Sequence, residues 1–374
     1  MTSLAKNMNS KKNNMLTLGA LMLVMLVLAL AENFLDSFSM QIFKLCAINI
    51  ILALSLNLIN GFTGLFSLGH AGFMAIGAYT CAVLTMSSDQ KEINYVLQPI
   101  APWLENIHMP FVPALILSGV VSCALGWFLG VVALRLRDDY LAIATLGFSE
   151  IIRVILTNAQ SVTNGSLGLK GLPRFTTMWW AWGLAVASVI FMLLLIRSSY
   201  GRAFKAIRDN AIAAESMGIN VFGTKVLSFA ISSGLAGIAG GLLAHHLTTI
   251  DPKQFIFLKT FDILLIVVLG GVGSITGSVI SAIVVTVAME ALRFMDGPLN
   301  LGFMVTAGTP GLRMVFFSIL LMVVVIYRQQ GLMGTNEFSW GALSRVQGCE
   351  AKSLRQTLRR RVSNGYLATN NRCK

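Results

Sequence analysis

FVPALILSGVVSCALGWFLGVVAL, residues 111–134, contains no charged side chain. About 20 apolar residues in a helix span the hydrocarbon layer of a bilayer, so this stretch predicts a transmembrane helix. Comparable runs are MLTLGALMLVMLVLALA (15–31) and VISAIVVTVAMEAL (279–292). The chain is 55% hydrophobic and 12% charged, with a mean hydropathy of +0.74. We therefore expect an all-α polytopic membrane protein with no soluble catalytic domain.

Hydropathy divides the chain into about ten transmembrane helices. They are expected near residues 15–31, 42–60, 66–86, 112–134, 140–157, 178–196, 226–247, 261–273, 275–291 and 312–327. The first run follows two lysines and also resembles a cleavable signal peptide, but retention is favoured because many spans follow. We expect a transmembrane domain over 1–335 and a basic, poorly ordered cytoplasmic tail over 336–374.

The distribution of basic residues predicts the orientation. With the N-terminus in the cytoplasm, 19 of the 28 Lys and Arg residues lie on the cytoplasmic side, 8 lie outside and Arg153 lies within a span. Cytoplasmic loops of membrane proteins carry such an excess, which supports ten helices with both termini inside. Most of the net charge of +12 then lies on the cytoplasmic face, where its expected targets are anionic lipid headgroups and an acidic partner surface. Nucleic acid is not an expected partner.

Nothing in the sequence predicts an enzyme. The five cysteines lack the spacing of a metal site or a disulfide framework, and no His, Asp or Glu cluster has catalytic spacing. GGVGSITG (270–277) lacks the Lys-Ser/Thr pair of a Walker A loop, so any ATP must be bound by another chain. No metal or other cofactor is expected.

Two glycine-rich segments, 58–79 and 266–280, interrupt the apolar pattern. Such glycines either break a helix beside a translocation pathway or let two helices approach closely, and these alternatives weigh about equally here. For Gly234, Gly237, Gly240 and Gly241, close packing is favoured. The candidate pathway residues are Asn57, Thr63, Ser67, His70, Glu150, Gly271 and Ser274.

Glu150 and Arg153 lie within a predicted span and share a helix face, because they are three residues apart. An unpaired charge at a helix centre costs about 2.5–3.5 kcal/mol on insertion scales, so the two are expected to pair. A structural pair is favoured over a lining or gating role.

Residues 197–224, RSSYGRAFKAIRDNAIAAESMGINVFGT, form a basic island between two predicted spans. YGRAFKAIRDN reads as a short amphipathic helix, and Asp209 or Asn210 can cap a second helix that ends at Gly218. In that second helix Ala211, Ala214 and Gly218 form a strip of small residues. The strip suits a partner protein that closes on it, although a helix lying on lipid fits the pattern equally well.

Five motifs in order resemble the LivM-type permease subunits of branched-chain amino-acid ABC importers. They are GFTGLFSLGHAGFMAIGAY (61–79), LRLRDDYLAIATLGFSEIIRVI (134–155), NGSLGLKGLP (164–173), YGRAFKAIRDNAIAAESMGIN (200–220) and VLGGVGSITGSVISA (268–282). The resemblance covers about residues 42–335. It implies a subunit of the bacterial inner membrane that works with two cytoplasmic ATPases, a second related permease and a periplasmic substrate-binding protein. Leu, Ile and Val are the implied substrates.

The resemblance also implies that residues 200–220 are the region that couples the permease to its ATPase. The importer signature there is Glu-Ala-Ala, three residues, then Gly, and Ile212 stands in place of its glutamate. The implied coupling residues are Arg202, Lys205, Arg208, Asp209, Asn210, Ile212, Ala213, Ala214, Glu215 and Gly218. Alternatives are a permease for urea or other small amino acids and, less favoured, an ATP-independent secondary transporter with Glu150 as its ion-coupling residue.

Overall fold

The computed structural model describes residues 36–95, 98–136, 138–293, 299–300, 305–306, 315, 318, 319, 322, 326 and 331–334. All of them belong to one compact unit, Leu28–Thr335. Its longer helices are α2 (Ser37–Asn57), α3 (His70–Thr85), α6 (Phe111–Ala133), α7 (Asp138–Asn158), α9 (Met178–Arg197), α10 (Ser199–Asp209), α12 (Val221–Leu247), α13 (Phe257–Gly270) and α14 (Ile275–Ala291).

Short elements connect these helices. The short helices are η1 (Leu58–Thr63, a π-helix), α4 (Ser88–Asn94), α5 (Pro102–Glu105), α8 (Gln160–Thr163), η2 (Gly165–Leu167), α11 (Ala211–Ser216) and η3 (Pro252–Phe255). Two antiparallel pairs of two-residue strands complete the described part: β1 (Leu169–Lys170) with β2 (Thr249–Ile250), and β3 (Leu299–Asn300) with β4 (Val305–Thr306).

Eight of the ten predicted spans fall in the described part, and each of them contains a helix. Five helices are long and apolar enough to cross a membrane: Ser37–Thr63, Phe111–Ala133, Tyr140–Asn158, Met178–Arg197 and Val221–Leu247. The apolar helices α3 and α14 are shorter. The predicted spans 15–31 and most of 312–327, like the tail 336–374, lie outside the described residues. The chain is thus a helical, polytopic membrane protein.

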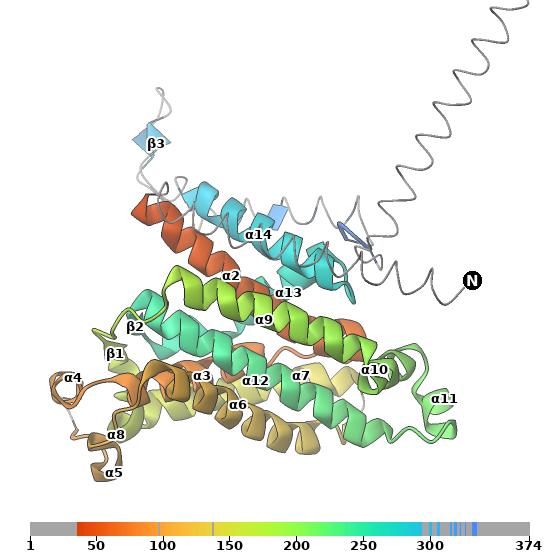
Figure 1. Cartoon of the computed structure of the whole chain (residues 1–374), viewed down its shortest axis with the longest axis horizontal. Coiled ribbons are helices and arrows are strands. Elements are labelled where there is room, and N and C mark those ends of the chain that lie inside the picture. Colours follow the sequence, from red (N-terminus) through yellow and green to blue (C-terminus); the bar gives the residue numbers. More distant parts are fainter. Residues whose placement is uncertain are drawn as a thin grey trace, which may run out of the picture. The chain divides into compact units, whose positions relative to one another are not determined.

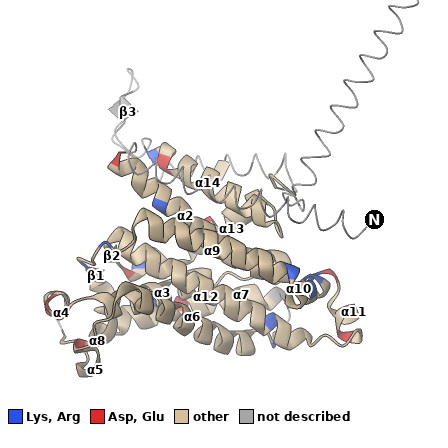
Figure 2. Ribbon diagram, in the orientation of Figure 1, with Lys and Arg blue, Asp and Glu red and all other residues tan. Residues whose placement is uncertain are grey.

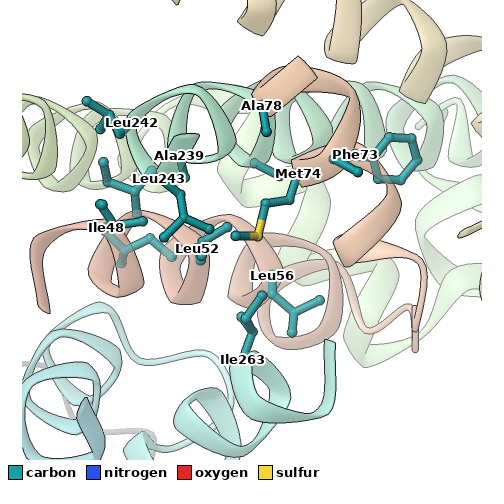
Figure 3. Close-up of a cluster of buried hydrophobic side chains, with 14 of the residues drawn as sticks. Ile48, Leu52, Leu56, Phe73, Met74, Ala78, Ala239, Leu242, Leu243 and Ile263 are labelled. Atoms are coloured by element: carbon teal, nitrogen blue, oxygen red, sulfur yellow. The ribbon is translucent and has the colours of Figure 1, made fainter. Parts of the chain in front are cut away.

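Helices α2 and α12 form the centre of the bundle. Every residue of α2 from Cys46 to Asn57 is buried, and α12 packs against α6, α3 and α2. Figure 3 shows the core where Leu52 and Leu56 of α2 meet Met74 of α3 and Ala239 of α12. The central position suits α2 because its polar side chains Asn49 and Asn57 find hydrogen-bond partners on α14, which lipid could not supply.

Glycines set the distance between α3 and α12. A Cβ atom at Gly240 would lie 2.0 Å from the backbone oxygen of Met74, and one at Gly77 would lie 2.1 Å from the oxygen of Gly237. The two backbones therefore touch, as small residues permit in membrane helices. The close packing predicted for Gly237 and Gly240 is what the structure contains.

The outer helices expose their apolar side chains. On α6, Ile116 is 61% exposed and Phe128 is 58% exposed, and on α7 Ile143 is 70% exposed. Charged residues gather instead near the ends of the helices (Figure 2). This pattern is the one expected of a surface whose solvent is the hydrocarbon of a bilayer.

The two ends of the bundle differ (Figure 1). One end carries α4, α5, α8 and the β1–β2 pair, whereas α10 and α11 project at the other end. The expected short helices of residues 199–224 are present as α10 and α11.

We predict that Gly240→Ala lowers the unfolding temperature of the purified protein by several degrees. The added Cβ meets backbone, which cannot move aside as a flexible side chain would, and overpacking of this kind costs about 1–3 kcal/mol. Gly183→Ala on α9 is the matched control, because its Cβ meets no atom within 4 Å. Equal unfolding temperatures for the two variants in the same detergent would contradict the α3–α12 contact.

Candidate functional site at the junction of α10, η1 and the glycine loop

The end of α2 is not an ordinary α-helix. Residues Leu58–Thr63 form a π-helix, and Gly64 follows in the left-handed conformation with φ of 76°. Single π-turns cost hydrogen-bond geometry and occur mostly at functional positions. Glycine adopts positive φ without the steric penalty of other residues, so Gly64 allows the chain to leave the helix here.

A second break lies beside the first, in the glycine loop, residues 271–274, which joins α13 to α14. Gly271 has φ of 111°, again a conformation that favours glycine. Asn57, the last residue of α2, accepts a hydrogen bond from the backbone N–H of Gly273 at 2.8 Å. Its amide donates to the oxygen of Ser274 at 2.9 Å and to Oγ of Ser278 at 2.8 Å. One buried side chain thus satisfies two polar groups of the broken backbone and also bonds to the hydroxyl of Ser278.

Helix α10 contacts this double break directly. The guanidinium of Arg208 donates from Nη1 to the backbone oxygen of Gly61 at 3.3 Å, and its stem passes so close to Gly64 that a Cβ there would lie 2.8 Å from Cγ. The ammonium of Lys205 lies 5.7 Å from the centre of the Phe62 ring, within the range of a cation–π contact. Arg208 also pairs with the neighbouring Asp209 at 2.9 Å. Two of the predicted coupling cations therefore contact the protein's own π-helix.

Local sequence explains the shape of the α10–α11 pair. Ser198 accepts a hydrogen bond from the backbone of Gly201 at the start of α10, and Asn210 accepts one from Ala213 at 3.0 Å at the start of α11. Phe204 is 0% exposed and Ile207 is 4% exposed, so α10 buries an apolar stripe. Asn210 is the predicted cap, and Gly218 follows α11 with φ of 82°.

The surface of α11 differs from the expected strip of small residues. Ala214 is only 4% exposed because it packs against the protein itself, which removes it from any partner surface. The large apolar side chains at the surface are Ile212, 79% exposed, and Met217, 83% exposed. Gly218 is exposed in open space, as are Ala213 and Glu215. Arg202 is exposed and donates to Ser199 at 3.0 Å.

The other predicted pathway residues are mostly buried. Thr63 is 2% exposed and bonds to the oxygen of Leu58, whereas Ser67 is 1% exposed in the connection to α3. His70, at the start of α3, is 1% exposed and shares a hydrogen bond of 2.7 Å with Ser55 of α2. Gly271 and Ser274 lie at the junction itself. Thr63, Ser67, His70 and Ser274 are thus all buried within the described part of the chain.

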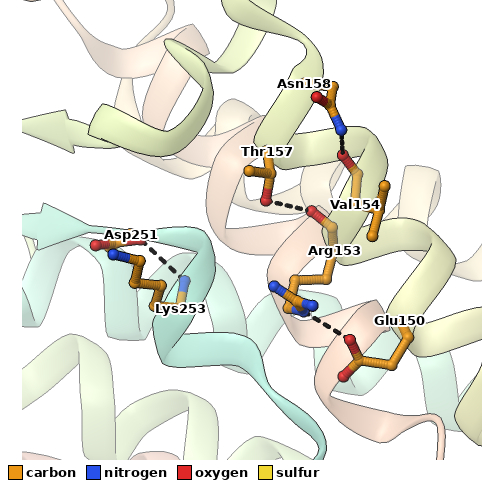
Figure 4. A network of polar contacts seen from close by, with 7 residues as sticks. All are labelled: Glu150, Arg153, Val154, Thr157, Asn158, Asp251 and Lys253. Atoms are coloured by element: carbon orange, nitrogen blue, oxygen red, sulfur yellow. Dashed lines mark hydrogen bonds and ion pairs between the residues drawn. The ribbon is translucent and has the colours of Figure 1, made fainter.

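Glu150 lies apart from the junction, on α7. Its carboxylate forms an ion pair with Nε of Arg153 at 2.7 Å (Figure 4). Both side chains are less than one third exposed. Glu150 and Arg153 therefore pair as expected. The ion pair neutralises the Glu150 carboxylate, which was the candidate ion-coupling group of a secondary transporter.

An apolar groove of about 680 Å³ lies between α3, α6 and α7. Val83, Leu125 and Ile152 are among its lining residues, and it contains none of the predicted pathway residues. A groove of this composition suits acyl chains and not a charged solute. Within the described residues, no three His, Cys, Asp or Glu side chains are placed to hold a metal ion.

Sequence reasoning missed two features of the junction: the π-helix and the inward reach of Arg208. The glycines at 61 and 64 and the polar residues around them were the available signal for the first. No sequence signal indicated the inward reach of Arg208, because helical spacing does not say which neighbour a basic side chain contacts.

Comparison with known proteins identifies the family to which the chain belongs. Residues 38–326 match the model of the family described as branched-chain amino acid transport system / permease component. The chain is 32% identical to the high-affinity branched-chain amino acid transport system permease protein LivM of Salmonella typhimurium, over 83% of this chain and 74% of that protein.

More distant relatives agree. The probable branched-chain amino acid transport permease protein LivM of Methanocaldococcus jannaschii is 22% identical over 76% of this chain and 89% of its own. The LivH permease protein of Escherichia coli is 26% identical over 65% of this chain and 80% of its own. No solved structure gave a significant match. The chain belongs to the family of branched-chain amino-acid transport system permease components.

Proposed function

We propose that this chain is a permease subunit of an ATP-driven importer for branched-chain amino acids. The observation that carries the proposal is its similarity to LivM proteins over most of its length. On this proposal the protein hydrolyses no ATP itself and forms the translocation pathway together with a second, related permease. A periplasmic binding protein delivers the substrate, and cytoplasmic ATPases drive the cycle.

The proposed topology has ten spans in the bacterial inner membrane, with both termini in the cytoplasm. Eight are the helices already described, and 15–31 and 312–327 supply the others. The permease domain is 1–335, and 336–374 is its cytoplasmic tail. With this topology α10 and α11 lie in the cytoplasm, where an ATPase can reach them.

Residues 200–220 are proposed to dock on the ATPase through α11. Exposed apolar side chains outside the spans are the usual anchors of a protein interface, and Ile212 and Met217 are of this kind. Arg202 and Glu215 supply exposed charge beside them. Arg208 and Lys205 then have another role, which is to join α10 to the π-helix.

Coupling follows from the contacts of Arg208 and Asn57. A displacement of α10 by the ATPase is transmitted by Arg208 to η1 and by Asn57 from α2 to the glycine loop. Both breaks are then proposed to open or close together beside the pathway. ATP drives this change only if the ATPase binds the two permease conformations with different affinity.

The docking proposal predicts that Ile212→Asp combined with Met217→Asp reduces the ATPase that co-purifies with the tagged chain at least about tenfold. Each apolar side chain contributes about 1.5–3 kcal/mol when fully buried, and about 1.4 kcal/mol corresponds to a factor of ten. Ile93→Asp in α4, 75% exposed at the other end of the bundle, is the control. Undiminished ATPase with the double variant would refute docking through α11. Absence of any ATPase from the unaltered chain, with uptake surviving ATP depletion, would refute the importer itself.

The coupling proposal predicts that Arg208→Ala retains the ATPase and its hydrolysis but lowers amino-acid uptake per ATP about tenfold. The variant removes the contact with Gly61 and leaves the α11 surface intact. Arg202→Ala, whose side chain bonds only to Ser199 in the described part, should leave that ratio unchanged. The ratio is measured in vesicles that contain the reconstituted complex. A normal ratio for Arg208→Ala would exclude this route of coupling.

The substrate assignment predicts that uptake of labelled leucine by cells expressing the complete transporter is competed by isoleucine and valine. Urea at the same excess should not compete, because it lacks both the charged groups and the apolar side chain of these amino acids. Competition by urea or by small polar amino acids, without competition by isoleucine, would favour the alternative substrates.

A further inference from the structure

A polar pocket lies at the end of the bundle opposite α10 and α11. Its volume is about 190 Å³, and its lining comes from the start of α2, the segment before α9 and the end of α12. Lys44 lies well before Asn57 on α2, about 20 Å along the helix axis at 1.5 Å per residue. The lining residues are Gln41, Lys44, Arg174, Thr176, His245, His246, Leu247 and Thr248, which include no carboxylate.

Two of its cations have no partner among the described residues. Three other basic residues at this end of the bundle have partners: Lys91 donates to the backbone oxygens of Leu104 and Ile107 at 2.7 and 2.6 Å, and Lys259 and Arg293 form ion pairs. Lys253 is exposed and lies outside the pocket. Lys44 and Arg174 make no hydrogen bond or ion pair within the described part, yet both face the same pocket. Lys44 is partly buried and Arg174 is exposed, so an anion in the pocket would be attracted by both charges.

Lys44 and Arg174 do not bond to the end of α12. Cations near a helix C-terminus often bond to its last carbonyls, and α12 ends here, but neither side chain makes such a hydrogen bond within the described part. Thr176 bonds further back in the helix, because its hydroxyl donates to the oxygen of Leu242 at 2.8 Å. His245 is also occupied, with Thr85 at 3.0 Å and the oxygen of Pro173 at 2.8 Å. Lys44 and Arg174 remain available to a ligand.

Two tryptophans that follow the segment containing Arg174 indicate that the pocket lies at the level of the lipid headgroups. Trp179 and Trp180, each 42% exposed, form the first turn of α9 immediately after the segment that supplies Arg174. Tryptophan is enriched at the membrane–water interface, where its ring lies among headgroups. An anion at this depth that is permanently present in a membrane is the phosphodiester of a phospholipid.

We propose that this pocket binds the headgroup of an anionic phospholipid. Arg174 offers the planar donor pair that matches phosphate oxygens, and Lys44 adds a mobile point charge. Gln41 and His246 provide further polar atoms around the group. The lining has no carboxylate to receive a choline or ethanolamine cation, so a headgroup with net negative charge is selected over a zwitterionic one.

The test uses the full-length protein, stripped of lipid by detergent exchange, and follows its thermal unfolding. Phosphatidylglycerol should raise the unfolding temperature by about 3–5 °C more than phosphatidylcholine with the same acyl chains. The combined variant Lys44→Gln, Arg174→Gln should lose this difference and keep the response to phosphatidylcholine. Lys253→Gln, an exposed lysine at the same end outside the pocket, should behave like the unaltered protein.

Equal shifts with the two lipids, or an unchanged difference in the combined variant, would overturn the proposal. So would an equal shift with inorganic phosphate alone, which would make the pocket a site for a free anion. If the combined variant does not fold, Lys44→Arg with Arg174→Lys takes its place, because it preserves both charges. This second variant should retain a preference for phosphatidylglycerol, and loss of the preference in a folded protein would contradict a site based on charge.

Discussion

The requirement that backbone groups be satisfied inside the membrane governs the rest of this structure. Two chain breaks occur at one end of the bundle, at η1 and at the glycine loop, and each releases N–H and C=O groups from regular helices. An unsatisfied group in hydrocarbon costs several kcal/mol. Asn57 removes part of that cost for the glycine loop, and Arg208 contributes a donor to Gly61. The polar backbone groups of each break are paired by residues from another segment: Arg208 of α10 for η1, and Asn57 of α2 for the glycine loop. The two breaks therefore form a single structural unit.

This arrangement connects the site to the fold. Helix α10 is held by its apolar stripe of Phe204 and Ile207, which places Arg208 against η1. The opposite surface of the pair, with Ile212 and Met217, is left without cover in the described part of the chain. One side of this short segment thus faces the membrane bundle and the other faces outward, a division that suits a mechanical link between two proteins.

Hydropathy predicted the membrane class and the position of each described long helix, because the length of an apolar run is a property of the sequence alone. A cap at Asp209 or Asn210 was also predictable from the sequence, because a capping side chain bonds to the backbone only two or three residues further on. Asn210 is the residue that caps α11. The direction of Arg208 was not predictable, because its partner Gly61 is far away in the sequence and becomes a neighbour only after α2 and α10 pack. Ala214 illustrates the same limit: its small size suggested a contact surface, but tertiary packing decides which partner uses that surface.

The central position of α2 has a consequence for biogenesis. Asn49 donates to Thr286 at 2.8 Å, and Asn57 bonds to Ser278 and to the glycine loop, so these polar side chains of α2 find their partners in α14 and the loop before it, more than 200 positions later. Chain synthesis proceeds from the N-terminus, and during that interval α2 is in the membrane without these partners. Its two asparagines must be hydrated near the membrane surface or held by the insertion machinery until α14 arrives. A central helix of the bundle is therefore made before the helix that supplies its partners, and it reaches its final environment only after α14 has been synthesised.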